Sequence, residues 1–169
     1  MANPIELYLI RHGLAEERGD AWPDDAKRPL TGKGVTRLRR TVAALEALDV
    51  TFDQVLTSPF LRARQTAEIV AQAGKAPIAS TSALAPGGTA AQVIEELGRY
   101  GARKRIALVG HEPAIGELAA RLLAIRTPLE FKKGAICRLD VETLPPARAG
   151  HLRWFATPRI LRAIAGKKS

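Results

Sequence analysis

Residues 5–13 read Ile-Glu-Leu-Tyr-Leu-Ile-Arg-His-Gly, an apolar run that ends abruptly at Arg11 and His12. A short run with aliphatic residues at both odd and even positions is typical of a strand buried on both faces of a parallel sheet. Runs of the same kind follow at residues 52–57 and 105–109. We therefore expect these three runs to be strands, with Arg11 and His12 at the end of the first.

Two helices are expected between these strands. The first should begin after Thr31 as N-cap and carry one apolar stripe, formed by Val35, Leu38, Val42, Leu45 and Leu48. The second has Ser58 as candidate N-cap, Pro59 at the first helical position and Gly74 beyond its end.

Two further helices and two late strands complete the pattern. Thr89 and Gln92 predict a capping box, and Pro113 opens another helix whose inward residues are Ile115, Leu118, Leu122 and Leu123. Residues 135–141 and 151–155 are predicted to be strands. Strands and helices that alternate in this way predict a layered α/β fold, in which ligands bind beyond the carboxyl ends of the strands.

Composition predicts one domain over residues 1–169, with residues 159–169 as a basic C-terminal tail. The chain has 169 residues and is 46% hydrophobic, enough for a single packed core. Its net charge of +9 predicts affinity for anions, whether phosphorylated substrates, acidic proteins or nucleic acid. Cys137 is the single cysteine, which excludes an internal disulfide framework and is assigned no chemistry.

The sequence also predicts where in the cell the protein is located. It has no apolar run long enough to span a bilayer, and a predicted strand begins close to the N-terminus. We therefore expect no signal peptide, no membrane partner and a cytoplasmic protein.

Four cationic or titratable side chains are predicted to converge at one edge of the sheet. Arg11 and His12 follow the first strand, and His111 follows the strand at 105–109. Arg62 lies in the first turn of the second helix, and helical side chains lean toward the N-terminus, so its guanidinium should point to the same edge. Like charges gathered in this way call for an anion, and phosphoryl oxygens suit the forked donors of arginine. The sequence thus predicts a phosphate site.

Each of these residues has a simpler interpretation when taken alone. A single histidine after a strand, such as His12 or His111, is typical of a hydrogen-bonded loop residue. Arg62 alone would be a solvated arginine in a basic run. Ser58 is interpreted as a helix cap rather than a nucleophile, because no glycine-flanked elbow surrounds it. The prediction therefore depends on the four residues occurring together.

Three segments of the chain resemble the histidine phosphatase superfamily. Residues 9–13 are similar to its Arg-His-Gly signature, residues 56–68 to its second block and residues 109–113 to its third. The likeness covers about residues 5–125. It implies a phosphoglycerate mutase-like fold, a three-layer α/β/α sandwich with a mostly parallel central sheet. The amino-acid sequence of residues 132–136 is most similar to that of the small phosphohistidine phosphatases of the SixA type.

The resemblance implies a role for each residue of the site. His12 would attack phosphorus and form a phosphohistidine intermediate, while Arg11, Arg62 and His111 would bind the phosphoryl oxygens. No metal and no cofactor are implied, and phosphate and vanadate are expected ligands. The implied partner is a phosphorylated protein of the histidine phosphotransfer type, or else a small phosphorylated substrate.

One departure from the wider superfamily bears on the substrate. Many members carry a proton-donating carboxylate between the second and third blocks, whereas residues 84–88 read Leu-Ala-Pro-Gly-Gly. Its absence favours phosphohistidine, because an imidazole leaves more readily than an alkoxide. A general phosphomonoesterase stays open as an alternative, since five carboxylates lie in predicted loops: Glu16, Glu17, Asp24, Asp25 and Glu112.

Two other classes of protein fit the sequence less well. A cysteine-dependent phosphatase is excluded, because the position six residues after Cys137 is Thr143 rather than an arginine. A basic nucleic-acid-binding module is a minor alternative suggested by the isoelectric point of about 10.3. The basic residues are dispersed and aromatic side chains are few, so nucleic acid is not the expected partner.

Overall fold

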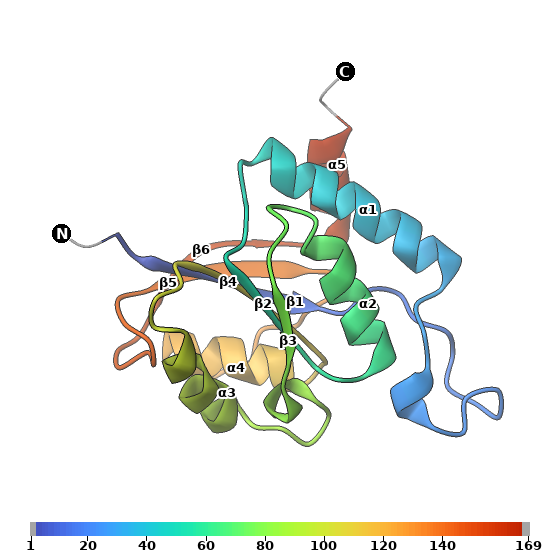
Figure 1. Ribbon diagram of the computed structural model, residues 1–169, viewed down its shortest axis with the longest axis horizontal. Coiled ribbons are helices and arrows are strands. Elements are labelled where there is room, and N and C mark those ends of the chain that lie inside the picture. Colours follow the sequence, from blue (N-terminus) through green and yellow to red (C-terminus); the bar gives the residue numbers. More distant parts are fainter. Residues whose placement is uncertain (1–2, 167–169) are drawn as a thin grey trace.

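A computed structural model describes residues 3–166, in which six strands form one mixed sheet in the order β3-β2-β4-β1-β5-β6 (Figure 1). The strands are β1 (Ile5–Arg11), β2 (Gln54–Thr57), β3 (Ile78–Ser80), β4 (Arg105–Gly110), β5 (Ile136–Val141) and β6 (His151–Ala156). The first four strands pair in parallel, whereas β5 and β6 are antiparallel to their neighbours. The predicted mostly parallel sheet is confirmed.

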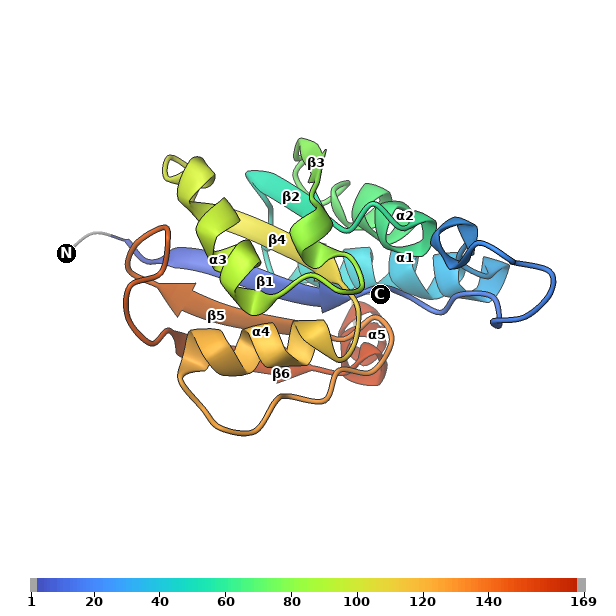
Figure 2. The same cartoon turned by 90° about the horizontal axis from the view of Figure 1, so that it is seen from below.

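Helices cover both faces of this sheet. They are α1 (Gly32–Ala47), α2 (Leu61–Val70), α3 (Ala90–Leu97), α4 (Ala114–Leu123) and α5 (Pro158–Ala165). Helices α1, α2 and α5 lie on one face, and α3 and α4 lie on the other, as the view from below shows (Figure 2). This is the predicted three-layer sandwich. Within residues 3–166, no helix combines the length and the apolarity needed to cross a membrane.

The central position of β1 in the sheet explains why apolar residues stand at both odd and even positions of the opening run. Tyr8 and Ile10 of β1 belong to the core beneath α1, α2 and α5, whereas Leu7 and Leu9 belong to the core beneath α3 and α4. Successive side chains of a strand point to opposite faces, so a strand between two helical layers needs apolar residues at all of these positions.

Two of the predicted helix starts are confirmed by their caps. The Thr31 side chain accepts the backbone N–H of Gly34 at 2.9 Å, and Thr89 with Gln92 forms the predicted capping box. The stripe of α1 is buried except near its ends, where Leu48 is 45% exposed because the helix ends at Ala47.

Other predictions of secondary structure were wrong. Helix α2 begins at Leu61 rather than Pro59, and Ser58 does not cap it. The short strand β3 was not predicted. Helix α5 at residues 158–165 was also not predicted; it includes the start of the basic tail and packs against α1 through the buried Leu161. The remainder of that tail, residues 167–169, lies outside the described residues.

Candidate active site

The carboxyl ends of β1, β4 and β2 lie next to one another. Arg11 of β1 stands opposite Gly110 of β4 in the parallel register, and the His12 N–H donates to the Gly110 carbonyl at 3.0 Å. His12 and His111 therefore leave the sheet side by side. Ser58 follows β2, on the other side of β4. The predicted convergence of strand ends thus follows from the strand order.

Gly13 sets the turn that carries the chain away from β1. A Cβ atom at this position would lie 2.7 Å from Cδ1 of Leu38 on α1, so no side chain fits without displacing Leu38. The Gly13 N–H donates to Oγ1 of Thr66 on α2 at 3.1 Å. The glycine of the Arg-His-Gly segment is thus required by close packing against two helices.

His12 is buried as a neutral ring. Its Nδ1 lies 2.8 Å from the carbonyl oxygen of Gly13, and because a carbonyl only accepts, we assign the ring hydrogen to Nδ1 and the lone pair to Nε2. Burial lowers the pKa of His12 to about 3, against the opposing effect of the Gly13 hydrogen bond. A neutral imidazole whose Nε2 carries a lone pair instead of a hydrogen has the properties of a nucleophile.

Arg62 reaches His12 from the first turn of α2, as the lean of helical side chains predicts. It is 2% exposed, and its Nε lies 3.3 Å from Nε2 of His12. Its two terminal nitrogens donate to Asp25, one to the backbone carbonyl at 2.9 Å and one to the carboxylate at 3.0 Å. Asp25 therefore holds the far edge of the guanidinium, and the Nε edge faces His12.

His111 lies beside His12, with 5.1 Å between the ring centroids, and is oriented by Ser58. Its Nε2 is 2.8 Å from the Ser58 Oγ, which also accepts the N–H of Phe60 at 3.2 Å. We assign the Ser58 hydroxyl as the donor to Nε2, and this assignment places the ring hydrogen of His111 on Nδ1. Burial, followed by the charge of Arg62, lowers the pKa of His111 to about 4.

Two buried donors at this site have no partner. They are Nε of Arg11 and Nδ1 of His111, and among the side chains of residues 3–166 they are the buried nitrogens or oxygens without a hydrogen bond. A buried donor left unpaired costs about 1 to 3 kcal/mol, so two of them at one site call for a ligand with acceptor oxygens. Another nitrogen of Arg11, Nη1, is fixed by the Phe131 carbonyl at 2.7 Å.

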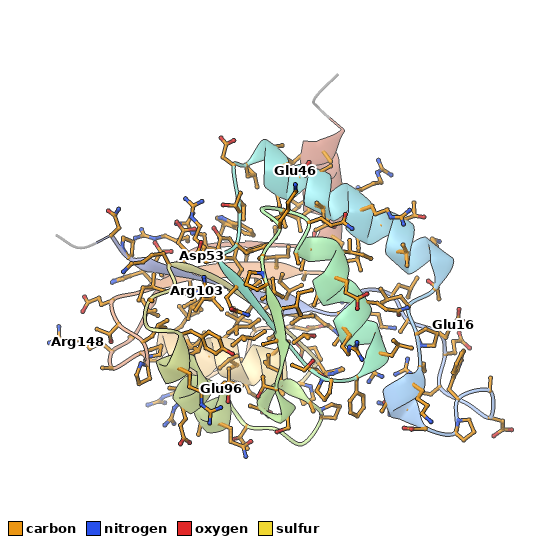
Figure 3. All side chains as sticks on the ribbon, viewed as in Figure 1. Glu16, Glu46, Asp53, Glu96, Arg103 and Arg148 are labelled. Atoms are coloured by element: carbon orange, nitrogen blue, oxygen red, sulfur yellow. The ribbon has the colours of Figure 1, made fainter. Side chains whose placement is uncertain are left out.

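All four predicted residues line one cavity of about 450 Å³. Charged side chains complete its wall: Glu16, Glu17, Arg18, Arg28, Glu112 and Lys133. Glu16 belongs to the segment between β1 and α1, at the opposite end of the molecule from Arg103 and Arg148 (Figure 3). No group of three or more His, Cys, Asp or Glu side chains within residues 3–166 is placed to hold a metal ion.

The carboxylates considered as proton donors differ in their surroundings. Asp24 accepts the N–H of Ala26 and does not line the cavity. Asp25 accepts from Arg62 and, at 2.8 Å, from Nε of Arg28. Burial acts to raise the pKa of Asp25, but these two arginines outweigh it and hold that pKa below its ordinary value. Asp25 is thus an ionised anchor and a poor acid.

Glu112 is the carboxylate best suited to hold a proton. It lines the cavity next to His111, and its Oε1 accepts the N–H of Phe131 at 3.0 Å. Burial raises the pKa of Glu112, although the Phe131 hydrogen bond and the charge of Arg11 oppose this. Glu16 and Glu17 also line the cavity.

Comparison with known proteins agrees with this geometry. The sequence model described as "Histidine phosphatase superfamily (branch 1)" matches residues 7–85. The phosphohistidine phosphatase SixA of Escherichia coli K12 is 31% identical over 159 residues, covering 91% of this chain and 94% of that protein. An uncharacterised protein of Picosynechococcus is 41% identical over 140 residues, covering 80% and 84%.

A solved structure of the protein histidine phosphatase SixA complexed with tungstate superimposes with a TM-score of 0.82 at 28% identity, covering 92% of this chain and 98% of that one. The chain therefore belongs to the histidine phosphatase superfamily, as its three sequence blocks predict. Within that superfamily it is most similar to the SixA-type phosphohistidine phosphatases, and it is a phosphatase of the hydrolase class.

Acidification is expected to destabilise the ligand-free protein. The pKa values of His12 and His111, about 3 and about 4, lie below the ordinary 6.5, so between these values the unfolded chain binds more protons than the folded one. The stabilisation is complete above pH 6.5 and is lost as pH falls toward 4, by on the order of 1 to 2 kcal/mol per histidine at about pH 5.

Thermal unfolding followed from about pH 7.5 to about pH 5 measures this effect. His111→Gln should reduce the slope of Tm against pH, whereas His151→Gln, at an exposed position of β6, should not. A slope that is the same in the His111 variant and the wild type would show that this ring is not buried in the neutral form.

Proposed function

We propose that this phosphatase works through a phosphohistidine formed on His12 and that it needs no metal ion. The observation that carries the proposal is the neutral His12 ring, whose Nε2 faces Nε of Arg62 in a cavity that also holds two unpartnered donors. In the first step Nε2 forms a bond to phosphorus while the bond from phosphorus to the leaving group breaks. Water then cleaves the new bond and releases inorganic phosphate.

The cationic groups supply the charge stabilisation that this transfer requires. A bound phosphoryl oxygen would accept the Nε–H of Arg62, which in the ligand-free site points at the His12 lone pair, and the nucleophile is thereby freed. Nε of Arg11 and Nδ1 of His111 would donate to the remaining oxygens. A loose phosphoryl-transfer transition state depends on such positioning and charge rather than on covalent assistance.

The proposed substrate is a phosphohistidine carried by a partner protein. Support comes from the Leu84–Gly88 segment, which has no carboxylate, and from the names of the SixA relatives. The imidazole of phosphohistidine leaves as a neutral ring once protonated, so the demand for a strong general acid is small. Tungstate, which is bound in the SixA structure, is an oxyanion like phosphate, and this supports an oxyanion site here.

One observation favours a second candidate, a phosphomonoesterase that acts on small phosphate esters. Glu112 lines the cavity and its pKa is raised, so it can retain a proton for a departing alkoxide. If this candidate is right, activity toward esters depends on Glu112, whereas activity toward phosphohistidine does not.

Rates measured on three substrate classes separate these candidates. We expect kcat/KM to be highest for a phosphohistidine peptide, lower for an activated aryl phosphate and lowest for phosphoserine or phosphoglycerate, because this order follows leaving-group quality. Glu112→Gln should leave the phosphohistidine rate within a few-fold of wild type, and Glu16→Gln and Glu17→Gln test the other two carboxylates that line the cavity. Alkyl phosphates cleaved as fast as phosphohistidine, with selective loss in the Glu112 variant, would establish the phosphomonoesterase instead.

A further inference from the structure

A second cavity of about 350 Å³ adjoins the catalytic one, between α1, α5 and residues 132–134. We call it the basic groove, because its charged lining consists of five cations and no described carboxylate: Arg11, Arg37, Lys132, Lys133 and Arg162. Arg11, Leu14 and Lys133 line both cavities. The two cavities are therefore neighbours, and a molecule bound in the catalytic cavity has the groove beside it.

The cations of the groove are poorly neutralised. In the part of the chain that the structure describes, neither Arg37 nor Arg162 forms an ion pair, and Lys132 pairs only with the exposed Glu130 at 3.3 Å. Helix α5 has no acidic residue, and the sole acid of α1, Glu46, lies at the carboxyl end of that helix (Figure 3), whereas Arg37 lies in its amino-terminal half. These positive charges are therefore available to bind an anionic group of another molecule.

The fold holds these charges close together although they repel one another. Arg37 and Arg162 are both half-buried, because Leu161 anchors α5 in the core that contains Leu38 of α1. The pKa of Arg162 is lowered by burial and then by the charges of Arg37 and Arg40. Packing alone gives no reason for unpaired arginines at this contact, whereas an anionic ligand would relieve the repulsion.

We infer that the basic groove binds carboxylate side chains that flank the phosphohistidine on the partner protein. This inference rests on the proposed function, since the phosphoryl group must enter the adjoining catalytic cavity. Nucleic acid fits less well, because none of the groove's lining residues is aromatic and bases would have no stacking surface. The half-buried arginine stems beside Leu38 suit the mixed apolar and acidic surface of a protein.

Two synthetic phosphohistidine peptides test the inference, one with glutamates and one with glutamines at the flanking positions. We expect wild-type kcat/KM to be about tenfold or more higher for the acidic peptide. Arg37→Glu/Arg162→Glu should bring this ratio to one or below. Arg39→Glu/Arg103→Glu changes the net charge equally but alters exposed residues outside the groove, so it should keep the ratio.

Binding of the unphosphorylated acidic peptide, followed by fluorescence anisotropy, separates the groove from the chemistry. If neither phosphopeptide is hydrolysed but this binding is present and is lost only in the groove variant, the proposed substrate is wrong, and the groove binds carboxylate side chains of a different partner. If both phosphopeptides are hydrolysed at equal rates, the proposed function stands and the groove inference is overturned.

Two further outcomes would also overturn it. One is an equal loss of preference in the control variant, which would assign the effect to net charge rather than to the groove. The other is tighter binding of single-stranded DNA than of the acidic peptide, with the same dependence on Arg37 and Arg162. Should the charge-reversed variant unfold, Arg37→Gln/Arg162→Gln provides the same test with a smaller expected change in the ratio.

Discussion

Replacing His12 with alanine is expected to abolish both turnover and covalent labelling. Brief mixing of the wild type with a labelled phosphoryl donor should leave an acid-labile, base-stable label on the protein, as a phosphorus–nitrogen bond requires. The variant has no Nε2 to form that bond, and loss of an attacking group commonly lowers kcat by about a thousandfold or more. Quenched-flow labelling and steady-state rates measure the two effects.

His151→Ala is the matched control for this experiment. His151 opens β6 at an exposed position and does not line the catalytic cavity, so its loss should change neither the label nor the rate. A label that survives in the His12 variant would move the nucleophile elsewhere. His111 would be the first candidate to examine, because its ring lies 5.1 Å from that of His12 and lines the same cavity.

Arg62→Ala is expected to lower kcat about a hundredfold or more, and Arg64→Ala to have little effect. The two arginines are two positions apart on α2, yet Arg62 is buried against His12 whereas Arg64 is exposed. Vanadate should raise the Tm of the wild type and of the Arg64 variant, but it should raise that of the Arg62 variant much less.

The Arg62→Ala variant is expected to keep its fold, and this can be measured in the absence of a ligand. Asp25 keeps its hydrogen bond to Arg28 when Arg62 is removed, so we expect the loop that carries Asp25 to stay ordered. Arg62→Lys tests the geometry, because a lysine supplies charge but cannot donate to Asp25 and the phosphoryl group as a planar fork. Equal and mild losses in the Arg62 and Arg64 variants would limit Arg62 to a structural role with Asp25.

Much of the sheet could be predicted from the sequence because burial leaves a local pattern. Both cores draw alternate residues from β1, so Leu7 to Ile10 are all apolar, and the caps at Thr31 and Thr89 involve only the next few residues. Strand β3 was missed because it has three residues, two of them exposed. Helix α5 was missed because it buries only Leu161 and otherwise reads as a basic tail.

The errors at the site have a different cause, which is long-range pairing. Ser58 followed by Pro59 satisfies a helix-start pattern, but the Ser58 hydroxyl is engaged by a histidine 53 positions away. Asp25 is 37 positions from Arg62, and nothing local distinguishes it from Asp24 or the other loop carboxylates. The residues proposed to bind phosphate could be named from strand ends and from the first turn of α2, whereas the residues that orient them could not.

His12 and the loop residues of the site lie in parts of the fold that differ in local stability. It follows β1, which has a paired neighbour on each side, so its backbone is released only when the sheet itself opens. Asp25 lies in the segment between β1 and α1, where a short 3-10 turn and a single bridge between Ala15 and Leu30 are the regular structure. Such a segment belongs to a less stable cooperative unit than a central strand and exchanges its amide hydrogens sooner. We therefore expect the backbone of His12 to open only with the sheet, and the orientation of Arg62 to be lost in local openings of the Asp25 segment.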